Sequence, residues 1–464
     1  MERPLRRLYL FFTLLFVALV LQLTYVQVWA APKLKVNPAN TRALEQEMRV
    51  DRGVILSADG VELAVNRQDG PYFLRRYPQG DLTSPWLGYN SLRYGRAGVE
   101  RVYNQELSGQ TGLLGITSYW DQILNRPHRG ADLRLTINMA VQKAAARALG
   151  NRKGAVVALD PRTGAVLAMV SYPRYDPNNL DSQWKDLNSD PAKPLLNRAT
   201  QGLYPPGSVF KVIVAGAALE TGAVTTKSNF DDSGTWLVGG YLVRNYGGKA
   251  YGKHDFSQAF ARSINTTFAK VGVQLGADAL ARAAADFGFG KVPPWPLGGA
   301  KSVFPNSADM DKAHVAQASF GQGLVLASPL EIALATCAVA NQGRIMKPYL
   351  VSQVLDYHQN VLSETRPEVW LRPLSAETAD QLRQLMIKVV NEGTGTAAAL
   401  NGVQVAGKTG TAEVEGAEPH AWFAGFAPAD NPRVVVAVLV ENAGTGGGVA
   451  APIARQVIAA ALGL

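Results

Sequence analysis

Cysteine is nearly absent from this chain of 464 residues, which contains only Cys337. A single cysteine rules out a disulfide within the chain, and it says little about the redox compartment. Cys337 lies in an apolar run over residues 332–340, where a small, weakly polar side chain suits a protein core. We therefore expect Cys337 to be buried and without a chemical role.

Histidine is also scarce, and the spacing of the five histidines is not typical of metal ligands. These residues are His128, His254, His314, His358 and His420. The sequence therefore predicts neither a metal site nor a bound cofactor. His420 adjoins the apolar segment around Trp422, and we expect it to line the wall of a groove rather than to act as a general base.

Charged residues make up only 18% of the sequence, and the net charge of +9 is spread along the chain without a long basic block. Such a distribution suits an anionic surface, such as lipid headgroups or an acidic polymer, better than nucleic acid. The sequence also contains no nucleic-acid-binding motif. We therefore expect no nucleic-acid partner.

Only one apolar stretch is long enough to span a membrane: residues 8–31 carry no charge. Arg3, Arg6 and Arg7 precede it, which predicts a cytoplasmic N-terminus and an exported remainder. We therefore expect a single-pass protein of the cell membrane, with residues 1–32 as cytoplasmic tip and anchor. A cleaved signal peptide, with a marginal cleavage site at residues 28–30, is the alternative, but the apolar run is longer than a usual signal core.

Residues 33–150 are expected to form a first exported domain, a non-catalytic pedestal. Residues 52–64 predict two short strands joined by an Asp-Gly turn. Gly, Pro, Arg and Tyr crowd the residues that follow, without clear periodicity, so we expect an extended module with little sheet. A helix over residues 136–149, capped by Thr136 or Asn138, should end at Gly150.

Residues 151–464 are expected to form the second exported domain. Its predicted order is a strand pair, several helices, three strands and a last helix, which indicates an α+β fold with helices packed on one five-stranded antiparallel sheet. The predicted strands are 155–159, 165–171, 403–413, 421–427 and 433–441, and the predicted helices are 208–220, 256–275, 277–287, 329–341, 376–391 and 449–462.

The helix that begins near Ser208 is the most informative stretch of the chain. Residues 205–207 are Pro-Pro-Gly, so the helix cannot start earlier, and the residues up to Glu220 are almost all apolar, which indicates a buried helix. Lys211 lies one turn deeper on the same face. Burial lowers the pKa of a lysine, so Lys211 could activate Ser208 as a nucleophile. Alternatively, Ser208 is only a helix cap and the Lys211 side chain reaches out of the core.

The same Ser-x-x-Lys pattern occurs at Ser182 and Lys185, in a polar setting that we interpret as rich in turns. That second occurrence shows how little the pattern means without its structural context.

A second misleading match is residues 402–409, which fit the phosphate-loop pattern G-x-x-x-x-G-K-T. A phosphate loop requires a strand, then a loop, then a helix. Here the middle of the motif alternates like a strand, and residues 411–416 cannot start a long helix. We interpret the segment as an edge strand lining a groove, where Lys408 and Thr409 bind a substrate carboxylate. The N–H of Thr411 would join that of Ser208 as an oxyanion hole.

The third element is Ser263-Ile264-Asn265, the only Ser-x-Asn in the chain. Ser and Asn favour helix ends, so this segment could be no more than a junction between two helices. In a catalytic context, Ser263 could relay a proton between Lys211 and a leaving amine, and the Asn265 amide could hold a substrate carbonyl.

These three motifs, in this order, resemble those of the penicillin-recognising serine enzymes. The N-terminal passages at 52–64 and 98–101 resemble the pedestal of class B penicillin-binding proteins, so the likeness covers nearly the whole chain. The resemblance implies a β-lactamase/transpeptidase-like domain with the following site: catalytic Ser208, Lys211 and Ser263, and substrate-binding Asn265, Lys408, Thr409, Gly410 and Thr411.

The resemblance implies a peptidoglycan D,D-transpeptidase, which cross-links stem peptides through a serine acyl-enzyme and is a target of β-lactams. It also implies a partner, a membrane glycan polymerase of the shape, elongation, division and sporulation family, because residues 33–150 are too few for a glycosyltransferase domain. Two alternatives remain. The enzyme could use water, as a D,D-carboxypeptidase or β-lactamase, although the Glu-x-x-Leu-Asn loop of class A β-lactamases is missing. It could instead be an acylatable β-lactam sensor.

Overall fold

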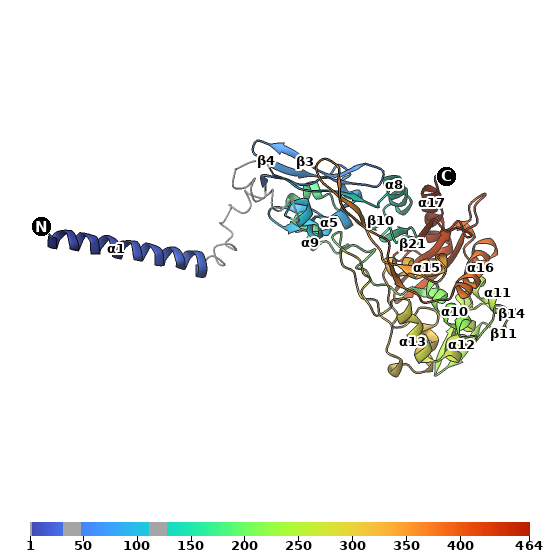
Figure 1. Ribbon diagram of the computed structural model, residues 1–464. Helices are drawn as coiled ribbons and strands as arrows, with labels where there is room; N and C mark the ends of the chain where they lie inside the picture. Colours follow the sequence, from blue (N-terminus) through green and yellow to red (C-terminus); the bar gives the residue numbers. More distant parts are fainter. Residues whose placement is uncertain (1, 31–47, 111–127) are drawn as a thin grey trace.

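The computed structural model describes residues 2–30, 48–110 and 128–464. Helix α1 (Glu2–Thr24) continues as a π-helix over Tyr25–Ala30 (Figure 1). The stretch Arg3–Trp29 is long and apolar enough to cross a membrane, as expected for the N-terminal segment. Residue 31 of the expected apolar run and the first part of the expected pedestal, residues 33–47, lie outside the described residues.

The N-terminal part contains a six-stranded sheet of order β17-β16-β8-β2-β3-β4 (Figure 1). The predicted Asp-Gly turn joins β2 and β3, and Gly60 adopts a φ of 77° there. The expectation of little sheet is wrong for the described part. The strands are β2 (Ile55–Leu56), β3 (Glu62–Asp69), β4 (Tyr72–Arg76), β8 (Asp132–Leu135), β16 (Val351–Leu355) and β17 (Val361–Glu364).

Two features explain why the sequence did not predict this sheet. Much of β3 and β4 is exposed or half-buried, so apolar and polar residues do not alternate along them. Strands β16 and β17 come from the far side of the predicted domain boundary, and β16 pairs antiparallel with β8. The boundary at residue 150 stays a prediction, since elements from both sides of it share this sheet.

The second sheet has five antiparallel strands, as predicted, and their order is β10-β9-β21-β20-β19. The central strands are buried on both faces, and β19 lies at an edge. The strands are β9 (Gly154–Leu159), β10 (Val166–Tyr172), β19 (Ala406–Val414), β20 (Ala417–Ala427) and β21 (Val434–Val440).

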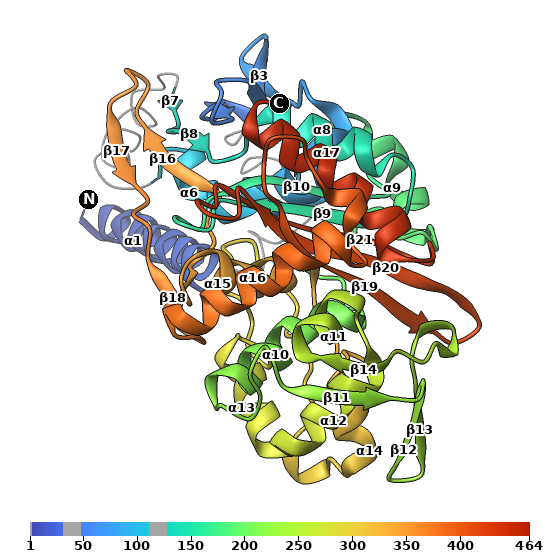
Figure 2. The same cartoon turned by 90° about the vertical axis from the view of Figure 1, so that its right-hand side faces the viewer.

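Helices cover both faces of this sheet (Figure 2). Alternate residues of a strand point to opposite sides of the sheet. On one side, Val156 and Val438 pack with α8 (Met139–Leu149) and α17 (Ala451–Leu462). On the other side, Val157 and Leu439 belong to the core formed with α10 (Lys211–Glu220), α15 (Pro329–Ala340) and α16 (Ala376–Glu392). Cys337 is buried in α15, as predicted.

The helical region between the two sets of strands departs from the prediction in two places. The expected helix over residues 256–275 is interrupted, giving α11 (Phe256–Arg262) and α12 (Asn265–Leu275). The stretch before it contains a short hairpin, formed by β12 (Thr235–Val238) with β13 (Tyr241–Arg244), and an antiparallel pair of the flanking strands β11 (Asn229–Asp232) and β14 (Gly252–Asp255). The predicted helix 277–287 is α13 (Ala277–Asp286).

Candidate active site

Ser208 lies in a 3₁₀ turn, Gly207–Phe210, that leads directly into α10. Gly207 has a φ of 54°, and a Cβ added there would lie 3.0 Å from the carbonyl oxygen of Thr411. A residue with a side chain would be strained in that conformation and crowded against β19. The glycine therefore lets the start of the helix pack directly on the edge strand, with Ser208 half-buried between them.

Lys211 is fully buried in the first turn of α10. Its Nζ donates to the carbonyl oxygen of Ser263 at 2.8 Å and to Oδ1 of Asn265 at 2.7 Å, and it lies 3.2 Å from Oγ of Ser263. The sequence spacing predicted a Ser208–Lys211 pair, yet no hydrogen bond joins these two side chains in the described structure. The ammonium instead points to the junction between α11 and α12.

That junction has a strained backbone. Ser263 ends α11 in the left-handed conformation, with φ 60° and ψ 45°. A serine pays an energetic penalty for this conformation, and such strain concentrates at functional sites. The Ser-x-Asn segment is therefore a junction between two helices, and its geometry turns both the carbonyl oxygen and Oγ of Ser263 toward Lys211.

Strand β19 brings Lys408 to the other side of Ser263. Lys408 is fully buried, and its Nζ lies 2.8 Å from Oγ of Ser263 and 3.1 Å from the carbonyl oxygen of Thr409. One serine hydroxyl therefore contacts two lysine side chains, from α10 and from β19. The three predicted motifs meet at this hydroxyl.

Burial governs the charge of both lysines. It lowers the pKa of Lys211 well below its ordinary value, and the neighbouring Lys408 lowers it further. Burial also lowers the pKa of Lys408, to about 7. Two ammonium groups this close disfavour each other, so Lys211, whose pKa is lowered both by burial and by Lys408, is the one we expect to be neutral near pH 7.

Gly410 allows β19 to approach the helix start. A Cβ on Gly410 would lie 2.9 Å from the carbonyl oxygen of Pro206 and 3.1 Å from Cγ1 of Val209. Next to it, Thr409 Oγ1 lies 2.5 Å from Oγ1 of Thr394. Thr394 is not among the predicted site residues, although it lies in a Gly-Thr-Gly-Thr run at 393–396, directly after a long helix.

We expect Gly410→Ala to destabilise the protein, because the added methyl group would push β19 away from the 3₁₀ turn. Overpacking of this kind costs about 1–3 kcal/mol. A thermal melt should therefore show a lower midpoint, together with slower labelling by penicillin. An unchanged melting temperature and labelling rate would show that the close approach of the two elements is unimportant.

Asn265 is held by two elements. Its Oδ1 accepts from Lys211, and its Nδ2 donates to the carbonyl oxygen of Arg244 at 3.0 Å. Arg244 ends β13, so the hairpin that sequence analysis treated as loop supports the site. The amide has a second N–H, for which no hydrogen bond is formed within the described residues.

Two cavities meet at Ser208. The larger, of about 320 Å³, is bounded by Ser263, Thr394, Thr409 and other residues, and the smaller, of about 130 Å³, lies toward the β12–β13 hairpin. Ser208, Asn265, Thr411 and Glu413 line both. The predicted site residues line these cavities, except for Gly410, which lies within β19, and the two lysines, which are buried behind the cavities.

Both misleading motifs are resolved by the structure. Ser182 and Lys185 lie on α9 (Leu180–Ser189), a helix rather than the expected turns, but both are exposed. Residues 406–409 belong to β19 and are not a loop before a helix, so the phosphate-loop interpretation stays excluded.

His420 is buried, and its Nδ1 accepts from the N–H of Asn442. Within the described residues, no cluster of His, Cys, Asp and Glu could hold a metal ion.

A Ser-x-x-Lys helix start, a Ser-x-Asn junction and a Lys-Thr-Gly edge strand on such a sheet define the class of penicillin-recognising serine enzymes. Family comparison agrees: the sequence model of the penicillin binding protein transpeptidase domain matches residues 154–459, and that of the penicillin binding protein A dimerisation domain matches residues 52–133. The chain belongs to the penicillin-binding protein transpeptidase family.

Individual relatives match along the whole chain. Peptidoglycan D,D-transpeptidase PbpA of Mycobacterium tuberculosis is 40% identical over 495 aligned residues, covering 100% of this chain and 99% of the relative. The Mycolicibacterium smegmatis protein of the same name is 39% identical, with the same coverage. Among solved structures, the ceftriaxone acyl-enzyme of penicillin-binding protein A from M. tuberculosis has a TM-score of 0.85 at 38% identity, covering 90% of this chain and 100% of that chain.

Proposed function

We propose that this protein is a serine D,D-transpeptidase that cross-links peptidoglycan stem peptides and is acylated by β-lactams. The observation that carries the proposal is the contact of Lys211 and Lys408 with one hydroxyl, that of Ser263, beside the cavities that Ser208 lines. The names of the M. tuberculosis and M. smegmatis relatives, and the acyl-enzyme structure, support it.

The contacts of Lys211 explain how it would act as a base. A neutral amine has two N–H groups and one lone pair. The carbonyl oxygen of Ser263 and Oδ1 of Asn265 take the two N–H groups, so the lone pair remains to accept a proton. In the reaction, one of the two side chains would turn so that this lone pair meets the hydroxyl of Ser208.

Acylation then follows from the positions of these groups. Oγ of Ser208 attacks the carbonyl carbon between the two D-alanines and passes its proton to Lys211. The N–H groups of Ser208 and Thr411 hold the oxyanion. When the intermediate collapses, Ser263 relays the proton to the nitrogen of the leaving D-alanine and the C–N bond breaks. An amine of a second stem then attacks the ester carbonyl, its proton passes through Ser263 to Lys211, and Lys211 returns a proton to Oγ of Ser208 as the ester C–O bond breaks.

The choice between amine and water as acceptor separates a transpeptidase from a carboxypeptidase or β-lactamase. Glu413 is the one carboxylate among the residues that line the two cavities at Ser208, and it is exposed. A base for deacylation has to be held against the acyl group, and no hydrogen bond fixes this exposed side chain among the described residues. This setting favours transfer to an amine.

The proposed function is tested by incubating the full-length protein in detergent with a stem-peptide thioester and a D-amino acid. We expect the amide product to exceed the hydrolysis product when the D-amino acid is in excess. Hydrolysis that dominates at every acceptor concentration would assign a carboxypeptidase instead. A single turnover without release would assign a sensor.

We further propose that the N-terminus is cytoplasmic and the catalytic part extracytoplasmic, because Arg3, Arg6 and Arg7 precede the apolar helix. The proposed division is 1–32 for the anchor, 33–150 for the pedestal and 151–464 for the transpeptidase domain. A membrane glycan polymerase of the shape, elongation, division and sporulation family is the proposed partner, with the membrane helix and pedestal as contact surfaces.

Lys408→Ala is expected to slow acylation by penicillin. A charge-assisted hydrogen bond to a carboxylate contributes roughly 1.5–3 kcal/mol, so the second-order rate constant should fall by about one to two orders of magnitude. Lys408→Arg should recover part of the rate, because a planar guanidinium fits the site differently. ATP with magnesium should leave the melting temperature unchanged. An unaffected penicillin rate in Lys408→Ala would contradict the carboxylate assignment.

The pH profile of acylation should report Lys408 as well. Its pKa of about 7 means that the ammonium is present below that pH and is lost as the pH rises. The second-order rate constant should therefore decline on the alkaline side, with a midpoint near the pKa of Lys408 in the free enzyme. Lys408→Arg keeps its charge and should remove this decline. If the arginine variant shows the same decline, another group is responsible.

A further inference from the structure

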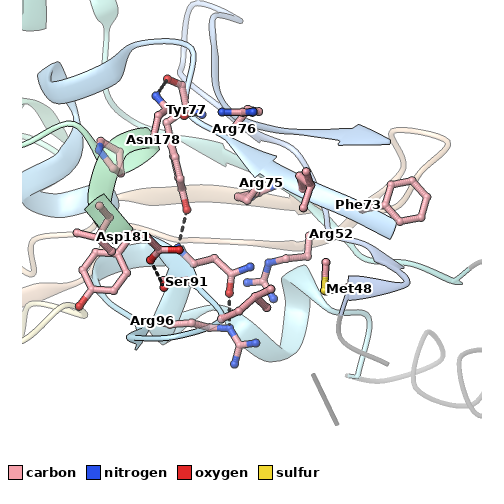
Figure 3. A pocket seen from close by; sticks show the side chains of 16 residues that line it. Met48, Arg52, Phe73, Arg75, Arg76, Tyr77, Ser91, Arg96, Asn178 and Asp181 are labelled. Carbon is pink, nitrogen blue, oxygen red and sulfur yellow. Dashed lines mark hydrogen bonds between the residues drawn. The ribbon is translucent and has the colours of Figure 1, made fainter. Parts of the chain in front are cut away.

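A separate cavity, of about 260 Å³, lies between β4, the hairpin of β5 (Asn90–Ser91) and β6 (Gly95–Arg96), and the 3₁₀ turn Pro177–Asn179 with the start of α9 (Figure 3). None of its lining residues lines the cavities at Ser208. Among the described residues, the charged lining consists of four arginines and one aspartate: Arg52, Arg75, Arg76, Arg96 and Asp181.

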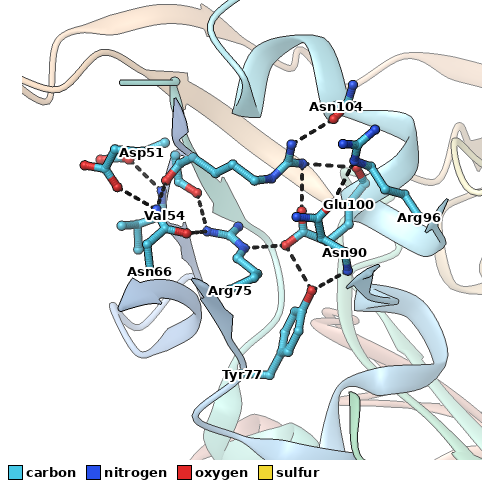
Figure 4. A network of polar contacts seen from close by, with 12 residues as sticks. Asp51, Val54, Asn66, Arg75, Tyr77, Asn90, Arg96, Glu100 and Asn104 are labelled. Atoms are coloured by element: carbon cyan, nitrogen blue, oxygen red, sulfur yellow. Dashed lines mark hydrogen bonds and ion pairs between the residues drawn. The ribbon is translucent and has the colours of Figure 1, made fainter. Parts of the chain in front are cut away.

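Behind the cavity wall, two of these arginines share one carboxylate (Figure 4). Glu100 is fully buried, and its oxygens accept from Nη2 of Arg52 at 2.8 Å and from Nε of Arg75 at 2.6 Å. Burial alone would raise the pKa of Glu100, but Arg75 and Arg52 together lower it, so the group is ionised. One negative charge cannot balance two guanidinium groups, and a positive charge remains beneath the wall.

Both guanidinium groups also keep unused donors. Arg75 donates from Nη1 to the carbonyl oxygen of Gly53 and to Asn66, but its Nη2 is buried without a partner among the described residues. The Nε of Arg52 is likewise buried and unpaired within the described part of the chain. Buried donors of a charged group that bind nothing are costly and call for an explanation, such as an ion.

The opposite wall and the rim of the cavity carry further charged side chains. Arg76, at the end of β4, is exposed, and Arg96 donates from Nε to Oδ1 of Asn90 at 2.7 Å. Asp181, the one acidic residue of the lining, accepts from Oγ of Ser91 at 3.0 Å. The cavity therefore has a surplus of positive charge at its mouth as well as beneath its wall.

We propose that this cavity is a binding site for a phosphate-class oxyanion. Guanidinium groups that approach from different elements suit a group with several oxygen acceptors, and arginine is the residue that proteins use for phosphate recognition. A water molecule takes about 30 Å³ of liquid volume, so the cavity has room for a diphosphate or for a phosphate with part of its ester group. A lipid headgroup or a soluble phosphate ester would both supply this chemistry.

The binding test uses the full-length protein in a maltoside detergent, titrated with inorganic pyrophosphate at constant ionic strength by calorimetry. We expect one saturable site, and Arg76→Gln or Arg96→Gln should each weaken it by about tenfold or more. Arg67→Gln is the matched control: it removes an exposed arginine of β3, next to β4, that does not line the cavity. The rate of labelling by penicillin should stay unchanged in all three variants, which shows that they are folded.

The source of the phosphate is then identified by displacement of pyrophosphate. Stronger displacement by short-chain phosphatidylglycerol than by glycerol phosphate assigns a lipid headgroup, and equal displacement by both assigns a soluble phosphate ester. Either result supports the site. Absence of saturable pyrophosphate binding overturns the proposal, and so does an equal loss in Arg67→Gln and Arg76→Gln, which would indicate general attraction to a protein of net charge +9.

Discussion

Ser208→Ala should abolish both labelling by fluorescent penicillin and transfer of a stem-peptide acyl group to a D-amino acid. Removal of the nucleophile of a serine enzyme lowers the rate by about 10⁶-fold, which is below the detection limit of either assay. The hydroxyl of Ser208 makes no hydrogen bond within the described structure, and the side chain is only half-buried. The variant should therefore keep its melting temperature.

The matched control is Ser182→Ala, which removes the serine of the other Ser-x-x-Lys sequence. Ser182 is exposed on α9, and within the described residues its Oγ donates one hydrogen bond, to the carbonyl oxygen of Asn179 at 2.9 Å. Labelling should be unchanged in this variant. Labelling that survives Ser208→Ala but not Ser182→Ala would reverse the assignment of the nucleophile.

Lys211→Ala should lower the acylation rate by about 10²–10⁴-fold, the usual contribution of a general base. The side chain is buried beside Ser263 and Asn265, so alanine would also leave a cavity and unpaired oxygens. Lys211→Met fills the same space without an amine, and it should lose as much activity as the alanine variant. Acylation by Lys211→Met within a few-fold of the unaltered protein would move the base elsewhere, with Ser263 as the next candidate.

Much of the site could be predicted from the sequence because each motif fixes its own local structure. Pro-Pro-Gly before Ser208 sets the start of a buried helix, and the long apolar runs mark the five strands of the second sheet. The spacing of Ser208 and Lys211 did not predict where the amine points. Its partners, Ser263 and Asn265, belong to another pair of helices, and only the tertiary packing brings them to α10.

Other features depended on contacts between distant segments. Thr394 reaches Thr409 only because α16 packs against β19. Strand β16 pairs with β8 across more than 200 residues of sequence, and no local pattern in residues 351–355 indicates that partner. The exposed ends of β3 and β4 resemble loop in the sequence, because their stability comes from pairing with each other rather than from a buried face.

The nucleophile is identified most directly by peptide mapping with mass spectrometry after the full-length protein has reacted with penicillin. We expect one adduct, on the peptide that contains Ser208, at the start of the helix whose Lys211 shares the hydroxyl of Ser263 with Lys408. An adduct on the peptide that contains Ser182, or the absence of any covalent adduct under conditions in which the protein is folded, would contradict it.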